Sequence, residues 1–133
     1  MNSFLGHITE VTTNGTMSIV CVGVGNGEEL MSVVIDSPET APYLKKGNKV
    51  NVLFKEMEVA ITTQKELDIS IGNRIAGNIA SIEEGVLLSR LILETKIGEV
   101  IAIISTKSVG QMGLVEKMNV MIMVKLNEII LAP

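Results

Sequence analysis

The chain has 133 residues, of which 47% are hydrophobic and 20% are charged, so its composition is that of a small folded protein rather than a disordered one. Its formal net charge of -4 and its aromatic content of 2% disfavour binding to nucleic-acid phosphates and stacking on bases. The single cysteine, Cys21, and the single histidine, His7, form a poor metal-ligand set and a poor basis for a catalytic triad, so we expect neither an enzyme nor a directly ligated metal.

The first ten residues have neither the basic start nor the apolar stretch of a signal peptide. Apolar runs elsewhere, such as residues 120–124, are far shorter than the ~20 residues that a membrane helix needs. With one cysteine there is no internal disulfide, which is typical of a reducing compartment. These features predict a cytoplasmic protein without a membrane partner.

In the first half of the chain, turn signals separate short apolar segments. Asn14-Gly15 and the glycine-rich residues 25–27 predict hairpin turns between β-strands. The apolar residues 49–54 predict a further strand that ends at Lys55. A polar stretch follows at residues 63–68 and is predicted to be a linker.

The second half has the same alternation of strands and turns. Residues 77–82 and 87–93 predict half-buried strands, whereas the continuous apolar runs at 100–104 and 120–124 predict strands buried on both faces. Between those two runs, residues 105–114 begin with polar capping residues and end near a glycine, which predicts one or two helical turns.

The two halves are an internal repeat. Residues 2–8 align with 73–79, residues 31–35 with 101–105, and residues 49–61 with 119–131. The repeat predicts an all-β protein of two tandem OB-like five-stranded β-barrel modules, 1–62 and 69–133, each with one short helix. Because modules of this size bury too little surface to be stable alone, we expect a homo-oligomer.

The second repeat also contains candidate donors for a tetrahedral oxyanion, which requires hydroxyls, backbone N–H groups and cationic side chains that converge. Ser105 and Ser108 begin the predicted helical turns, Lys125 ends a core strand, and Ser70 and Gly72 precede the first strand of the repeat. The alternative interpretation is that the two serines at 105 and 108 are only helix caps and that Lys125 is a solvated strand end.

Five segments of the second repeat resemble the Mop (molbindin, TOBE-type) domain: residues 70–77, 104–109, 112–114, 120–125 and 129–132. Domains of this family are small cytoplasmic modules that bind molybdate or tungstate, so the resemblance implies a di-Mop protein or the effector domain of a molybdate-responsive regulator. It implies a molybdate site made of Ser70, Gly72, Ser105, Thr106, Ser108 and Lys125, with Arg74, Lys55 and Lys107 as secondary candidates.

The chain departs from the family pattern at two places. Gly72 stands where the family has an arginine, and Arg74 would project to the same side of a strand two residues later. In the first repeat, Ile35 and Pro38 occupy the positions of the two serines, so that only Lys55 is retained.

The sequence therefore predicts a molybdate-binding or tungstate-binding protein for storage, homeostasis or sensing. The alternative is a degenerate module of a regulator that serves self-association and no longer binds an oxyanion. An OB-type oligonucleotide binder is a third possibility, which the acidic charge and the scarcity of aromatic residues disfavour.

Overall fold

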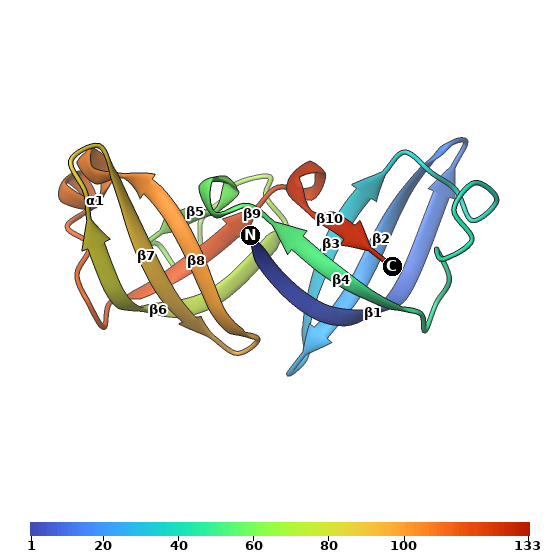
Figure 1. The fold of residues 1–133 in the computed structure, drawn as a ribbon, viewed down its shortest axis with the longest axis horizontal. Coiled ribbons are helices and arrows are strands. Elements are labelled where there is room, and N and C mark those ends of the chain that lie inside the picture. Colours follow the sequence, from blue (N-terminus) through green and yellow to red (C-terminus); the bar gives the residue numbers. More distant parts are fainter.

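The computed structural model describes residues 1–133 and contains two curled antiparallel sheets of five strands each, arranged side by side (Figure 1). The first sheet has the spatial order β10 (Ile130–Ala132), β4 (Lys49–Phe54), β1 (Asn2–Asn14), β2 (Met17–Gly25) and β3 (Glu28–Val34). The second has the order β5 (Ala60–Thr62), β9 (Asn119–Val124), β6 (Asn73–Glu84), β7 (Leu88–Thr95) and β8 (Gly98–Ser105). This architecture confirms the predicted all-β fold with two OB-like modules.

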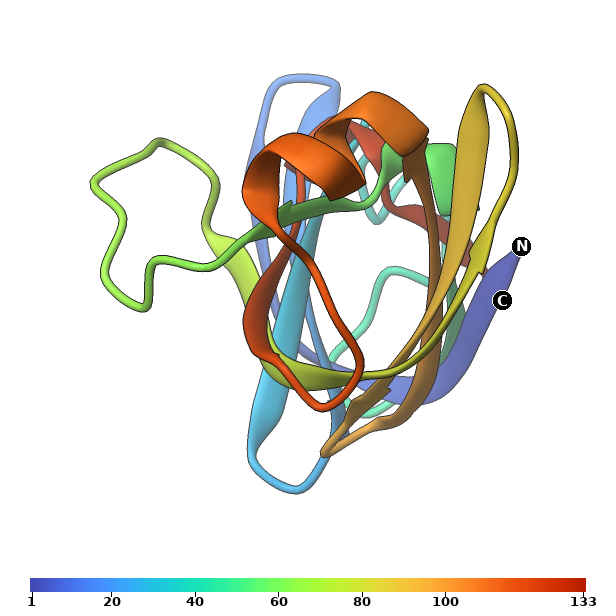
Figure 2. The same cartoon turned by 90° about the vertical axis from the view of Figure 1, so that its left-hand side faces the viewer.

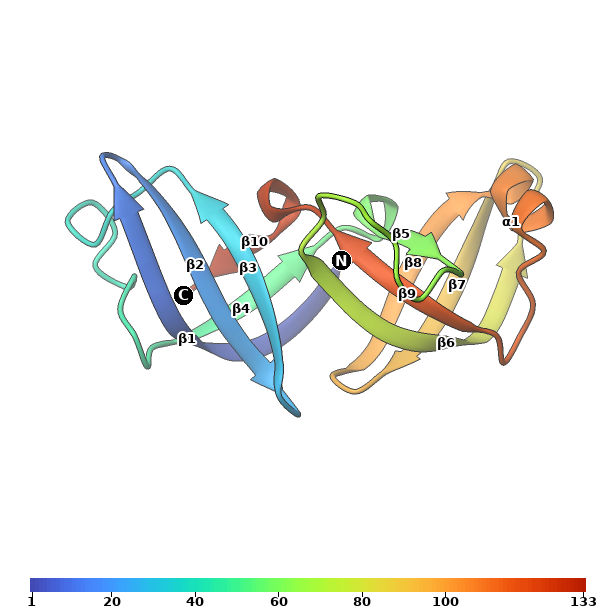
Figure 3. The same ribbon diagram turned by 180° about the vertical axis from the view of Figure 1, so that it is seen from behind.

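The last strand of each repeat lies in the sheet of the other repeat. β5 pairs with β9, with Ile61 opposite Ile122, and β10 pairs with β4, with Leu131 opposite Val52. The view from behind shows both short strands at the junction between the sheets (Figure 3). The ranges 1–62 and 69–133 thus describe the repeat in the sequence, whereas each sheet is completed by a strand from the opposite half.

The long first strand of each repeat bends in the same way. The register of β1 against β2 shifts between Ile8 and Glu10, and that of β6 against β7 shifts between Ile79 and Ser81. Such bulges increase the local twist and let a sheet curl. Gly77 on β6 allows a close approach as well, because a Cβ there would lie 2.8 Å from the carbonyl oxygen of Glu94.

One hydrophobic core extends through both halves. It comprises 24 buried residues from both repeats, including the fully buried Phe54, Leu93 and Ile122. In β2, the buried residues alternate with more exposed ones, as expected for a strand with one face on the core. The two sheets are therefore parts of one folding unit rather than independent domains.

The predicted helix of the second repeat is present as α1 (Thr106–Met112), which covers one end of the second sheet (Figure 2). It ends at Gly113, whose φ of 63° is in the left-handed region that favours glycine. The first repeat has turns at residues 37–44 instead of the expected helix. Ile35 supplies no capping hydroxyl there, and Pro42 has no N–H to donate to a helical hydrogen bond.

Two short 3-10 turns, η1 (Glu56–Glu58) and η2 (Leu126–Glu128), each follow a lysine at equivalent places in the repeats. With α1 only seven residues long, the structure contains no helix that has the length and apolar character to cross a membrane.

Candidate functional site

The first group of candidate residues lies where β8 leads into α1, and we name Ser105, Thr106, Lys107 and Ser108 the outer cluster. Ser105 caps the helix, since its Oγ accepts a hydrogen bond of 3.1 Å from the backbone N–H of Ser108. The Ser105 hydroxyl also donates to the Ser108 hydroxyl at 2.8 Å. Because Ser108 Oγ accepts this bond, its own hydrogen is free to bond with a ligand.

Thr106 is fully engaged with the β6–β7 hairpin. Its backbone N–H donates to the carbonyl oxygen of Leu87 at 2.9 Å, and its hydroxyl donates to the carbonyl oxygen of Gly85 at 2.8 Å. The hydroxyl oxygen also lies 2.8 Å from Ser89 Oγ. The backbone N–H and the hydroxyl of Thr106, a residue of the implied molybdate site, thus already have partners within the chain, and Thr106 joins the hairpin to α1.

The second group, Ser70, Gly72, Arg74 and Lys125, lies at the opposite end of β6, and we name it the inner cluster. In the pairing of β6 with β9, Asn73 is opposite Val124, which brings Gly72 and Lys125 to the same end of this strand pair. Gly72 also lies beside β3, because a Cβ at position 72 would be 3.5 Å from the Cε of Met31.

Lys125 has an exposed side chain and forms neither of the two ion pairs in the structure. It precedes η2 with φ and ψ of -68° and 151°, and Lys55 precedes η1 with -77° and 150°. Figures 1 and 3 show these two 3-10 turns, coloured red and green, near the middle of the molecule. The repeat therefore places one unpaired lysine at the equivalent position in each half.

Arg74 is bound to the backbone of the segment that precedes it. Its Nε donates to the carbonyl oxygen of Ile71 at 2.7 Å, its Nη1 to that of Leu67 at 2.7 Å, and its Nη2 to that of Ile69 at 2.6 Å. All three guanidinium nitrogens thus have a partner within the chain.

The outer and inner clusters are far apart within one chain. Ser105 is opposite Leu88 at the start of β7, beside the far end of β6, whereas the inner cluster lies at Asn73, where β6 begins. The 12 residues of β6 correspond to about 36 Å along the curved strand. A single copy consequently does not bring the serine hydroxyls to Lys125.

The sequence reasoning assigned no role to two asparagines that connect the sheets. Asn73, buried in β6, accepts a bond from the N–H of Met31 and donates one to its carbonyl oxygen, both at 2.8 Å. Asn2 makes the equivalent pair of bonds to Ile101, at 2.8 and 2.9 Å. The sequence feature that could have indicated these contacts is the asparagine at the start of the first strand in both repeats.

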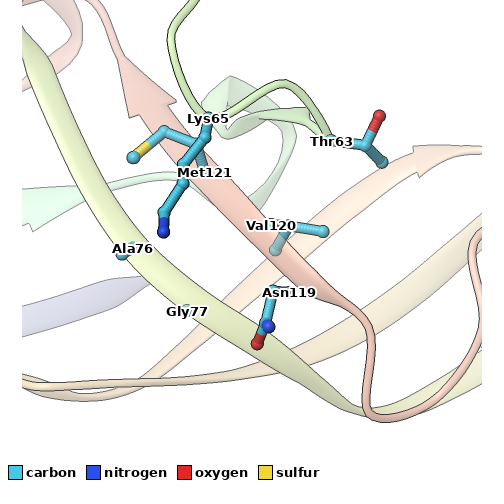
Figure 4. A pocket seen from close by; sticks show the side chains of 7 residues that line it. All are labelled: Thr63, Lys65, Ala76, Gly77, Asn119, Val120 and Met121. Atoms are coloured by element: carbon cyan, nitrogen blue, oxygen red, sulfur yellow. The ribbon is translucent and has the colours of Figure 1, made fainter.

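A cavity of about 270 Å³ lies between the segment after β5 and the strands β6 and β9 (Figure 4). Its lining residues are Thr63, Lys65, Ala76, Gly77, Asn119, Val120 and Met121. None of the predicted oxyanion ligands is among them, so the candidate site is not this cavity.

Cys21 is half-buried in β2 and forms no disulfide. Burial raises the pKa of its thiol, and the carboxylates of Glu29 and Glu10 raise this pKa further. A thiol held in its protonated form is a weak nucleophile.

No protein-family model matches the sequence, and no curated protein sequence matches it either. Among solved structures, the chain is similar to the cytoplasmic molybdate-binding protein ModG, crystallised with molybdate bound. The TM-score is 0.91 at 23% sequence identity, and the alignment covers 98% of this chain and 94% of that chain. The chain has a Mop-type fold. Since the similarity covers almost the whole chain, the Mop-type fold includes the first repeat, although Ile35 and Pro38 stand where the second repeat has serines.

Proposed function

We propose that this protein binds molybdate or tungstate in the cytoplasm, for storage, homeostasis or sensing of the oxyanion, and catalyses no reaction. The observation that carries the proposal is the similarity in fold, over nearly the whole chain, to a protein crystallised with molybdate bound. The residues of the inner cluster support it, because they offer an exposed cation without a carboxylate partner at the same end of the β6–β9 strand pair as Gly72.

In the proposed site, the ammonium group of Lys125 neutralises part of the charge of the dianion. The hydroxyl of Ser70 and the backbone N–H groups around Gly72 donate hydrogen bonds to its oxygens. Bonds to a charged acceptor are roughly twice as strong as those between neutral groups, so a few such donors suffice.

The separation of the two clusters supports a site shared between copies. We propose that the outer cluster of one copy, with the free hydroxyl hydrogen of Ser108, meets the inner cluster of a neighbouring copy in a homo-oligomer. In the first repeat, Ile35 and Pro38 supply no hydroxyl, so Lys55 is the only ligand which that repeat offers from its own motif.

Two observations favour the alternative, a module that serves self-association alone. Gly72 provides no cationic side chain, and the N–H of Thr106 is bound to Leu87. Under this alternative the protein assembles but has no affinity for oxyanions, which a binding measurement distinguishes directly.

The direct test of the site is the molybdate affinity of Lys125→Ala. The loss of a charged partner should weaken binding by about tenfold or more, with an unchanged melting temperature because Lys125 makes no ion pair in the fold. Lys46→Ala is the matched control, since Lys46 is an exposed lysine in a turn of the first repeat. An unchanged affinity of Lys125→Ala would exclude this lysine from the site.

A mixing experiment tests whether copies share the site. Ser108→Ala and Lys125→Ala should each bind weakly, and a sample in which the two variants have been dissociated and reassembled together should regain part of the binding. Reassembly pairs an intact outer cluster with an intact inner cluster at some interfaces. If the mixture binds no better than the separate variants, the site does not combine these two residues from different copies.

A further inference from the structure

The segment between β5 and β6, residues 63–72, has no regular secondary structure. Its only hydrogen bond to another group, apart from those of Arg74, is from the N–H of Gln64 to Thr62 Oγ1. Every hydrogen bond that residues 65–72 make therefore goes to the guanidinium of Arg74. The candidate ligands Ser70 and Gly72 are both in this segment.

The three carbonyl groups that Arg74 binds belong to alternate residues, Leu67, Ile69 and Ile71. A guanidinium is planar and presents its N–H groups in a fixed fork, so three simultaneous bonds define the path of the backbone around it. The ammonium group of a lysine is a point charge on a flexible chain and has no such geometry. Arg74 is half-buried and forms no ion pair, so its hydrogen bonds go to the backbone alone.

From this geometry we infer that Arg74 is a positioning residue, which holds residues 67–72 in one conformation and presents Ser70 and Gly72 beside Lys125 before an oxyanion arrives. Its effect on binding rests on the function proposed above. Since a segment that is ordered in advance loses less entropy when it binds, fixing the backbone raises affinity without any contact between Arg74 and the ligand.

Two substitutions separate this role from that of a ligand or a simple positive charge. Arg74→Lys keeps the charge and removes the fork, and Arg74→Gln removes both. Arg90→Gln is the matched control, because Arg90 makes one exposed ion pair with Glu83 in the hairpin at the other end of β6. For each variant, the backbone NMR order parameters of residues 67–72 and the rate of cleavage after Glu66 by a glutamate-specific protease are measured without ligand, followed by the dissociation constant for molybdate.

In both Arg74 variants we expect cleavage that is faster by about tenfold or more, lower order parameters in this segment, and a melting temperature close to that of the original protein. We also expect both variants to bind molybdate about tenfold more weakly, whereas Arg90→Gln should match the original protein in every measurement. A variant that merely lowered overall stability would have a lower melting temperature and would leave the order parameters of this segment unchanged.

The inference is overturned if the order parameters and the cleavage rate of the segment do not change in Arg74→Lys and Arg74→Gln. It is equally overturned if Arg74→Lys binds molybdate as the original protein does while Arg74→Gln does not, because charge rather than geometry would then account for the effect. If the original protein binds no molybdate, the proposed function fails, and the order parameters and the cleavage rate without ligand still decide whether Arg74 orders the segment.

Discussion

The side-chain amide of Asn73 bonds to both backbone groups of Met31 and thereby joins the first strand of the second repeat to an edge strand of the first sheet. Asn2 bonds to both backbone groups of Ile101 in the same way, and thereby joins the first strand of the first repeat to an edge strand of the second sheet. An asparagine amide has one acceptor and one pair of donors, so it can satisfy an N–H and a carbonyl group of one residue at the same time. The two contacts connect the sheets in addition to the exchanged strands.

Asn73→Ala should lower the free energy of unfolding by about 2–3 kcal/mol, since two hydrogen bonds are lost and the backbone groups of Met31 are left without partners. Urea denaturation followed by circular dichroism measures the change. Asn78→Ala on the same strand is the control, because the Asn78 side chain makes no hydrogen bond in the structure. Equal stability of the two variants would show that the contact between the sheets contributes nothing.

The exchange of β5 and β10 predicts that the two halves unfold together. Leu131→Asp places a charge at a position that is 9% exposed in β10, and the cost should be about 3 kcal/mol or more. Because β10 belongs to the second repeat but pairs with β4 of the first, we expect a single cooperative transition at lower denaturant concentration. Hydrogen exchange that increased in one sheet only, or two separate transitions, would contradict this coupling.

Gly72→Arg should fold normally and should strengthen molybdate binding by about tenfold. The φ of Gly72 is outside the left-handed region, and a Cβ would meet only the flexible end of Met31 at 3.5 Å, so a side chain fits. The added guanidinium would supply the cation that the family pattern has at this position. Gly72→Gln, which adds a side chain of similar length without charge, separates the effect of charge from that of size. A loss of affinity in both variants would mean that the backbone at position 72 must approach the ligand closely.

Stability should decrease at alkaline pH. Burial raises the pKa of Cys21 and of Tyr43, with further contributions from Glu29 and Asp36 respectively, so the folded state holds these protons more tightly than the unfolded state. The stabilisation is complete below the ordinary pKa values, about 8.5 for cysteine and about 10 for tyrosine. It is lost as the pH rises through the higher values of the folded state. Denaturation curves from pH 7 to 11 should therefore show that the free energy of unfolding decreases as the pH rises. In Cys21→Ala the decrease should be smaller in the lower part of this pH range. An unchanged decrease in this variant would contradict the role of Cys21.

The fold could be predicted from the sequence because the chain contains an internal repeat. The aligned segments, the turns at Asn14-Gly15 and residues 25–27, and the apolar run at 100–104 together predicted ten strands in two OB-like modules, which the structure has. The exchange of strands was not predictable, because the local pattern of residues 60–62 and 130–132 is that of a strand in either sheet. Residues 37–44 had no strong helical signal, and their prolines explain why turns replace the helix there.

Only part of the candidate site could be predicted from the sequence. Sequence spacing identified the serine cap at residue 105 and the lysine at the end of β9, and both are exposed as expected. The partners of Thr106 and Arg74 depend on segments that are brought together by tertiary structure, the β6–β7 hairpin and residues 67–71. The binding roles of these residues stay predictions, because they depend on how copies of the chain assemble.

The most direct test is an isothermal titration of the protein with molybdate, with tungstate and sulfate as comparison ions, together with native mass determination of the same sample. We predict tight binding of molybdate and tungstate, weaker binding of sulfate, and a number of bound ions that follows the number of chains in the oligomer. A protein that assembles but gives neither heat nor thermal stabilisation with any of the three ions would contradict the account and favour a module that serves self-association alone.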